Sequence, residues 1–125
     1  MSKMVMVVDD SFMVRQQVGK ALKGAGFEVV EAGDGQDALE KLGVNPGVAL
    51  VVCDVNMPRM SGIEFLERLR EDQSQAALPV VMLTTEGQND IIQRAKALGA
   101  KGWITKPFKA DLLIAAAKKL AGVAA

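Results

Sequence analysis

The feature of this sequence that most constrains its fold is the alternation of short apolar segments with longer segments of helical periodicity. The short segments are rich in valine, methionine or other apolar residues, and most of them lack polar alternation. They are Met4–Val8, Glu28–Ala32, Leu50–Cys53, Val80–Leu83 and Trp103–Thr105. Continuous apolar runs are typical of strands that helices cover on both faces, as in a parallel sheet. We therefore predict that each of these segments forms a strand of one parallel sheet.

The segments between these strands carry the apolar stripes and capping residues of helices. Ser11 is placed to cap the first helix, whose apolar stripe includes Val14 and Val18. Ser61 and Glu64 form a capping-box pattern at the start of the third helix. The helices are predicted after Ser11, from Asp34 or Gly35 to Leu42, from about Ser61, from Asn89 or Asp90 to Leu98, and from about Ala110 to Ala121.

The succession of strand–helix units defines the expected topology. Crossover connections between parallel strands are right-handed, and one common order for a doubly wound sheet is 2-1-3-4-5. The six-stranded Rossmann order needs more strands than this sequence offers. We predict an α/β, flavodoxin-like fold, a doubly wound five-stranded parallel sheet in that order. The chain of 125 residues has the size of one ordinary domain, so residues 1–125 are expected to form a single domain.

Charge, cysteine and histidine content exclude several classes of function. The 15 basic residues balance the 15 acidic ones, so no general attraction to nucleic acid is expected. Cys53 is the only cysteine and cannot form an internal disulfide, and no long apolar run predicts a membrane segment. We therefore expect a cytoplasmic location. The chain has no histidine, so its chemistry must use carboxylates, hydroxyls and amines.

Polar residues follow four of the predicted strands. Asp9 and Asp10 follow the first strand, Asp54 the third, Thr84 and Thr85 the fourth, and Lys106 the fifth. Each has an ordinary structural explanation when taken alone. An acidic pair after a strand is often a helix cap, and a single aspartate is often a turn former. A threonine can be an ordinary strand residue, and a lysine can be a solvated residue at the end of a strand. Ligands of open parallel sheets, however, bind beyond the carboxyl ends of the strands, where the strand order reverses. We therefore expect the three aspartates to meet between the first and third strands.

A cluster of three carboxylates implies a bound cation, because like charges held close together repel. Oxygen ligands without histidine or cysteine favour a hard ion, and Mg²⁺ binds through carboxylates, waters and phosphate oxygens. Lys106 and Thr84 could contact the remaining oxygens of a phosphoryl group. Aspartate is an established nucleophile toward phosphorus. The pattern therefore predicts phosphoryl transfer to an aspartate.

The motifs at these strand ends closely resemble those of the receiver family of two-component signalling, over nearly the whole chain. They are Val7-Val8-Asp9-Asp10-Ser11, Asp54-Val55-Asn56-Met57-Pro58-Arg59-Met60-Ser61-Gly62, Thr84-Thr85, and Trp103-Ile104-Thr105-Lys106-Pro107-Phe108. The resemblance implies that Asp54 is the phosphoacceptor and that Thr84 and Lys106 hold phosphoryl oxygens. It implies Mg²⁺ as the cofactor, bound by Asp10 and Asp54, by Asp9 largely through water, and by the backbone carbonyl of Asn56.

The resemblance also implies partners and a switch. The phosphodonor would be a histidine kinase or a small molecule such as acetyl phosphate, and the protein would be a monomer. Thr84 would be drawn toward the phosphoryl group while the aromatic residue at position 103 turns inward, which reshapes the face of the fourth helix, fifth strand and fifth helix. Trp103 stands where the family more often has Tyr or Phe, and Lys109 where Ser or Thr commonly caps the last helix. The Lys106–Pro107 bond is expected to be cis.

Two pathways and two other classes of protein are alternatives. We expect no DNA-binding or catalytic module after residue 121 and therefore output through protein contacts. These contacts would serve either chemotaxis-type control of a flagellar motor or a relay to a histidine phosphotransfer protein through the first helix. Asn56 and Glu86 resemble the pair of residues found in chemotaxis regulators and favour a short-lived phosphoryl state.

A flavodoxin-like nucleotide or flavin binder would need glycine-rich amides instead of carboxylates. An aspartate-based phosphatase would need an aspartate at position 56. Beyond self-phosphorylation and autodephosphorylation, no enzyme activity is expected.

Overall fold

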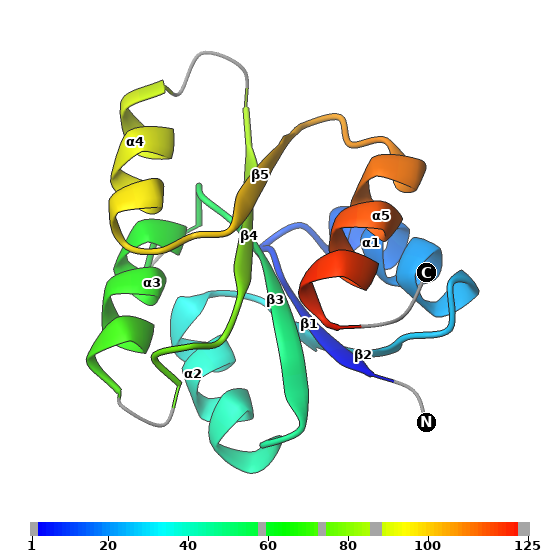
Figure 1. Cartoon of the computed structure of the whole chain (residues 1–125), viewed down its shortest axis with the longest axis horizontal. Coiled ribbons are helices and arrows are strands. Elements are labelled where there is room, and N and C mark those ends of the chain that lie inside the picture. The colour runs from blue at the N-terminus through cyan, green and yellow to red at the C-terminus, as the bar shows by residue number, and fades with distance from the viewer. Residues whose placement is uncertain (1–2, 58–59, 73–74, 86–88, 123–125) are drawn as a thin grey trace.

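The computed structural model describes residues 3–57, 60–72, 75–85 and 89–122, and within these ranges strands and helices alternate along the chain (Figure 1). The elements are β1 (Met4–Val8), α1 (Phe12–Gly24), β2 (Glu28–Ala32), α2 (Gly35–Val44), β3 (Val48–Asp54), α3 (Gly62–Glu71), β4 (Val80–Thr84), α4 (Asn89–Ala97), β5 (Gly102–Thr105) and α5 (Ala110–Leu120). The strands form one parallel sheet in the order β2-β1-β3-β4-β5. The predicted fold class and strand order are therefore confirmed.

The helices cover both faces of this sheet (Figure 1). Helices α1 and α5 lie on one face, while α2, α3 and α4 lie on the other. Side chains of β1 alternate between the two cores: Val5 and Val7 pack with α1 and α5, whereas Met6 and Val8 pack toward α2 and α3. This burial on both sides explains why the central strands are continuously apolar.

Some element boundaries differ from the predicted ones. Strand β3 starts at Val48, two residues before the predicted start, because Val48 pairs with Met4 across a register shift in β1. Helix α2 continues to Val44, whose side chain is largely exposed, so its apolar pattern could not mark the end of the helix. Among the described residues, no helix has the length and apolar character needed to cross a membrane.

The predicted helix caps are present at the two ends where the sequence pattern was clearest. The Ser11 hydroxyl accepts a hydrogen bond from the Val14 amide at 3.3 Å. At the start of α3, the Ser61 hydroxyl accepts from the Glu64 amide at 3.2 Å while the Glu64 carboxylate accepts from the Ser61 amide at 3.4 Å. Lys109 precedes α5 without a side-chain cap. The capping box thus anchors the helix that follows the Asp54 loop.

Replacing Ser61 with alanine is expected to lower the free energy of unfolding by about 1 kcal/mol, because the first turn of α3 loses the acceptor for its amide. Urea denaturation of the wild type and the variant measures the difference. Lys109→Ala is the matched control and should leave the midpoint nearly unchanged, since Lys109 makes no side-chain cap. Equal midpoints for the wild type and Ser61→Ala would contradict a stabilising role for the box.

Candidate functional site

The candidate site lies at the carboxyl edge of the sheet, where four strands end in polar residues. Asp9 and Asp10 follow β1, Asp54 is the last residue of β3, and Thr84 is the last residue of β4. Lys106 follows β5 and its amide donates to the Thr84 carbonyl at 2.7 Å. The β1–β3 pairing ends at Val8 and Cys53, so the residues that follow, Asp9 and Asp54, come side by side.

Asp9, Asp10 and Asp54 form the predicted carboxylate cluster. One carboxylate oxygen from each lies within 4.8 Å of the others, as a metal site requires. Asp9 and Asp54 are buried, whereas Asp10 is exposed at the mouth of the cluster. Asp9 is held in place by the Ser11 amide, which donates to its Oδ1 at 2.9 Å. The cluster therefore combines a rigid buried pair with one accessible carboxylate.

Lys106 supplies the positive charge at the centre of the site. Its ammonium donates to Asp9 Oδ2 at 3.0 Å and lies 3.1 Å from Asp54 Oδ1. Burial lowers the pKa of Lys106, but the hydrogen bonds and charges of Asp9 and Asp54 outweigh this effect, so the pKa is raised overall. The ammonium therefore stays protonated. The following Lys106–Pro107 bond is cis, as expected.

The site holds more negative charge than Lys106 neutralises. Burial raises the pKa of Asp54, and the neighbouring Asp9 carboxylate raises it further, while the Lys106 ammonium and a hydrogen bond from the Asn56 backbone act in the opposite direction. The pKa of the Cys53 thiol is raised well above its ordinary value, first by burial and then by Asp54 and Asp9. Cys53 is therefore a buried, protonated thiol.

Thr84 brings an unpaired hydroxyl to the same edge. Its Oγ1 is buried and has no hydrogen-bond partner among the described residues. A buried hydroxyl without a partner costs about 1–3 kcal/mol, so such a group indicates a place where a ligand oxygen can be accommodated. Leu83, the residue before Thr84, pairs with Asp54 across the β3–β4 register. Thr84 is therefore placed close to the carboxylate cluster.

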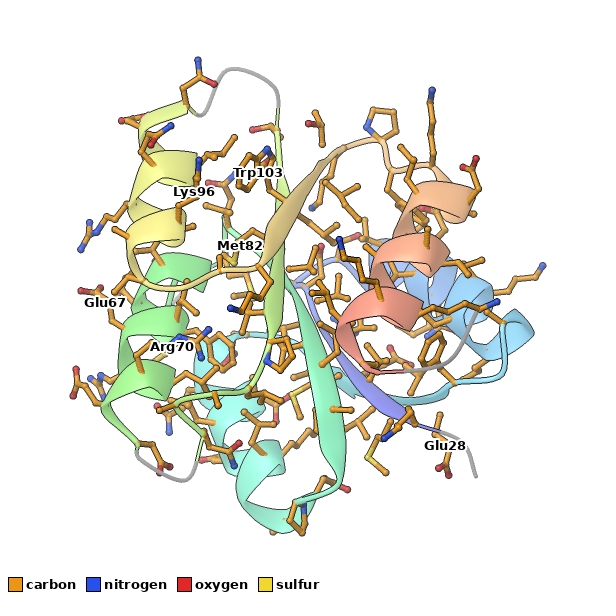
Figure 2. The ribbon with its side chains drawn as sticks, viewed as in Figure 1. Glu28, Glu67, Arg70, Met82, Lys96 and Trp103 are labelled. Atoms are coloured by element: carbon orange, nitrogen blue, oxygen red, sulfur yellow. The ribbon has the colours of Figure 1, made fainter. Side chains whose placement is uncertain are left out.

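The other predicted site residues have different surroundings. Asn56 is exposed just after Asp54, and its backbone amide is hydrogen-bonded to the Asp54 carboxylate. Glu86 lies outside the described residues, as do Pro58 and Arg59 of the Asp54 motif. Trp103 is 41% exposed and lies on the α4 side of β5 (Figure 2). The structure therefore brings the aspartates, Thr84 and Lys106 together but leaves Trp103 at the surface.

Arg15 is a supporting residue that the sequence analysis missed. Its Nη1 donates to the Asp9 backbone carbonyl at 2.6 Å, and its Nε donates to Glu31 at 3.1 Å. Arg15 thus ties the Asp9 loop to the edge strand β2. The helical spacing of α1 gives no sign of this contact, because Glu31 becomes a neighbour only when β2 pairs beside β1.

A doubly wound sheet with aspartates and a lysine at its carboxyl edge defines a class of signalling domain. The family described as "Response regulator receiver domain" matches residues 5–118. The chain therefore belongs to the response-regulator receiver family, whose members of the chemotaxis type act as regulators and are not classical enzymes.

Several chemotaxis regulators are similar to this chain. It is 43% identical over 106 residues to the chemotaxis protein CheY of Treponema pallidum, covering 83% of this chain and 72% of that protein. It is 36% identical over 110 residues to the chemotaxis protein CheY1 of Helicobacter pylori, with 87% and 89% covered. The solved structure of CheY4 of Vibrio cholerae has a TM-score of 0.89 and 38% identity, with 96% of this chain and 99% of that chain covered. The chain is thus a response regulator with chemotaxis-type homologues.

Proposed function

We propose that Asp54 accepts a phosphoryl group from a histidine kinase in the presence of Mg²⁺ and that the modified protein signals through contacts with other proteins. The observation that carries this proposal is the position of Asp54, a buried carboxylate that shares the Lys106 ammonium with Asp9. A buried aspartate beside a second carboxylate is poorly compensated for a purely structural role. It is well suited to react with an electrophile that also brings oxygens for Lys106 and Thr84.

The donor set of the cluster fits Mg²⁺. Asp9, Asp10 and Asp54 converge, and with the Asn56 backbone carbonyl they would offer the oxygen-only ligands that this ion prefers. When bound, Mg²⁺ would neutralise charge on the carboxylates and on the phosphoryl oxygens. The raised pKa of Asp54 supports the need for such a cation, because Lys106 does not fully offset burial and the Asp9 charge.

The residues of the chain then have separate roles in the transfer. A carboxylate oxygen of Asp54 forms a bond to phosphorus, while the bond from phosphorus to the donor's imidazole nitrogen, or to the acetate oxygen of acetyl phosphate, breaks and its electron pair leaves with the donor. Lys106 remains close enough to exchange its contact with Asp54 for one with a phosphoryl oxygen. The Thr84 hydroxyl, which has no partner in the described structure, donates to another oxygen. The new phosphoryl group would therefore draw both residues toward Asp54.

Output is proposed through the face formed by α4, β5 and α5. Trp103 and Leu112 are exposed there and line a groove beside Lys109. An aromatic side chain and an aliphatic one, rimmed by cations, suit recognition of another protein. The chemotaxis names of the relatives favour a flagellar motor component as the target over a histidine phosphotransfer protein. We propose that residues 1–125 act as one cytoplasmic, monomeric receiver domain that can also return to its resting state by autodephosphorylation.

Incubation of the protein with acetyl phosphate and Mg²⁺ is expected to add one phosphoryl group, detected by mass spectrometry of the intact chain. Chelation of Mg²⁺ with EDTA before the donor is added should prevent the addition, because the carboxylates would then repel the incoming phosphate. Peptide mapping of the adduct should place it on Asp54. No adduct with Mg²⁺, or an adduct of equal yield in EDTA, would contradict the proposal.

A further inference from the structure

Lys96 and Trp103 form a contact that the proposed transfer does not use. The Lys96 ammonium of α4 lies 5.3 Å from the centre of the Trp103 ring of β5, within the range of a cation–π interaction. Figure 2 shows the two side chains next to each other between α4 and β5. Met82 of β4, the strand partner of Trp103, is labelled in the same view. Both residues are exposed, so the stacked indole lies at the surface.

The strand register places Trp103 and Thr84 on the same face of the sheet, two residues apart along the strands. Met82 pairs with Trp103, and Thr84 pairs with Thr105. Residues two apart on a strand share a face, so Met82, Thr84 and Trp103 all face the side that α4 covers. A movement of the Thr84 hydroxyl would therefore alter the same face of the sheet on which the indole lies.

Helix α4 is suited to respond to such a change. Of its described residues only Ala95 is buried, and Ile91 packs against the same core while partly exposed, so the helix has a small buried apolar face. Lys96 follows Ala95 directly and reaches toward the edge strand β5. The orientation of the indole and the position of α4 are therefore linked by the Lys96–Trp103 stack.

We propose that Lys96 is a positioning residue that holds Trp103 in its surface orientation and thereby opposes the phosphoryl-bound state. This rests on the proposed function, and on the expectation from the receiver resemblance that phosphoryl binding at Asp54 favours an inward Trp103. A ligand shifts a conformational equilibrium only by its differential affinity for the two states. If a contact is made only in the resting state, its removal tightens the apparent binding of any ligand that selects the phosphoryl-bound state.

The test uses the full chain, beryllofluoride with Mg²⁺ as the phosphoryl analogue, and fluorescence of Trp103, the only tryptophan. Lys96→Met is expected to tighten apparent beryllofluoride binding by about two- to fivefold, the factor that an exposed cation–π contact supplies. The emission of the unliganded variant should also change, because the charge leaves the ring face. Lys96→Arg should retain the wild-type affinity, since a guanidinium also stacks on indole.

Lys101→Met is the matched control, because Lys101 is an exposed lysine in the turn between α4 and β5. It removes the same charge without removing the stack, and we expect at most a weakening of analogue binding through lost electrostatic attraction. In a Thr84→Ala background the effect of Lys96→Met on analogue affinity should disappear, because the Thr84 hydroxyl that links phosphoryl binding to the Trp103 face of the sheet is absent. Affinities of Lys96→Met equal to or weaker than those of Lys101→Met would overturn the proposal for Lys96 alone. Absence of analogue binding by the wild type would overturn the proposed function together with it.

Discussion

Asp54→Asn is expected to abolish Mg²⁺-dependent phosphorylation and, near neutral pH, to make the protein more stable than the wild type by roughly 1–2 kcal/mol. The amide lacks the anionic oxygen that attacks phosphorus in the proposed transfer. The gain in stability has a separate cause: the buried Asp54 carboxylate lies beside that of Asp9, and Lys106 compensates both with a single charge. A residue that reacts at the cost of stability is typical of functional sites.

The pH dependence of this gain follows from the pKa of Asp54. That pKa is raised above the ordinary 3.8, chiefly by burial and then by Asp9. The folded state therefore binds the proton more tightly than the unfolded state, and ionisation of Asp54 removes stability as the pH rises above the unfolded value. Asp54→Asn should consequently be more stable near neutral pH, and the difference should fade below about pH 4, where the carboxyl is protonated in both states.

Urea denaturation at a series of pH values, without Mg²⁺, measures both effects. Glu40→Gln is the matched control, because it converts an exposed carboxylate on α2 to an amide and should change stability by less than about 0.5 kcal/mol. An Asp54→Asn protein that is less stable than the wild type at neutral pH would show that Lys106 compensates the pair fully. Persistence of the phosphoryl adduct in this variant would assign the acceptor to another residue.

Gly62→Ala is expected to destabilise the protein by about 3 kcal/mol or more, although alanine is ordinarily the better helix former. A Cβ at Gly62 would overlap the backbone carbonyl oxygen of Asp54 and would lie 2.9 Å from the Val55 Cα. These neighbours are backbone atoms of β3 and of the loop after it, so they cannot move aside as a flexible side chain could. The Gly62 amide also donates to the Val55 carbonyl at 2.9 Å, which closes the loop.

Thermal and urea denaturation of two other glycine variants calibrate this effect. Gly43→Ala in α2 meets nothing within 4 Å and is expected to be neutral or stabilising by up to about 1 kcal/mol. Gly35→Ala approaches the Met60 side chain at 2.8 Å and should have an intermediate cost, because a methionine can change rotamer. If Gly62→Ala were as stable as Gly43→Ala, α3 would have to shift readily relative to β3.

Much of the candidate site could be predicted from local sequence signals combined with one rule of topology. Apolar runs identified the strands, and the capping box at Ser61 identified the start of α3, since both depend on contacts close in the chain. The parallel order then required Asp9, Asp54 and Lys106 to meet, because the strands end at the same edge. Boundaries such as the end of α2 were less predictable, since Val44 contributes no buried face.

Other features depend on distances that no sequence pattern encodes. The residue pattern alone does not say which of the adjacent Asp9 and Asp10 is buried, yet Asp9 is buried against Lys106 and Asp10 is exposed. Arg15 reaches Glu31 only because β2 lies beside β1, and Lys96 reaches Trp103 only because α4 packs beside the edge strand. Each contact joins elements that are separate along the chain, so side-chain reach and packing decide it.

The class of fold, the strand order and the residues gathered at the carboxyl edge of the sheet follow from the amino-acid sequence, because periodicity, capping and the direction of parallel strands are local or topological properties. Three features follow from packing in three dimensions: Asp54 and Asp9 share one ammonium, the Thr84 hydroxyl is without a partner among the described residues, and Trp103 lies outward against Lys96. These features depend on the burial of individual side chains and on distances of a few ångströms between them. On them depend the pKa of Asp54 and the proposed balance between the two states.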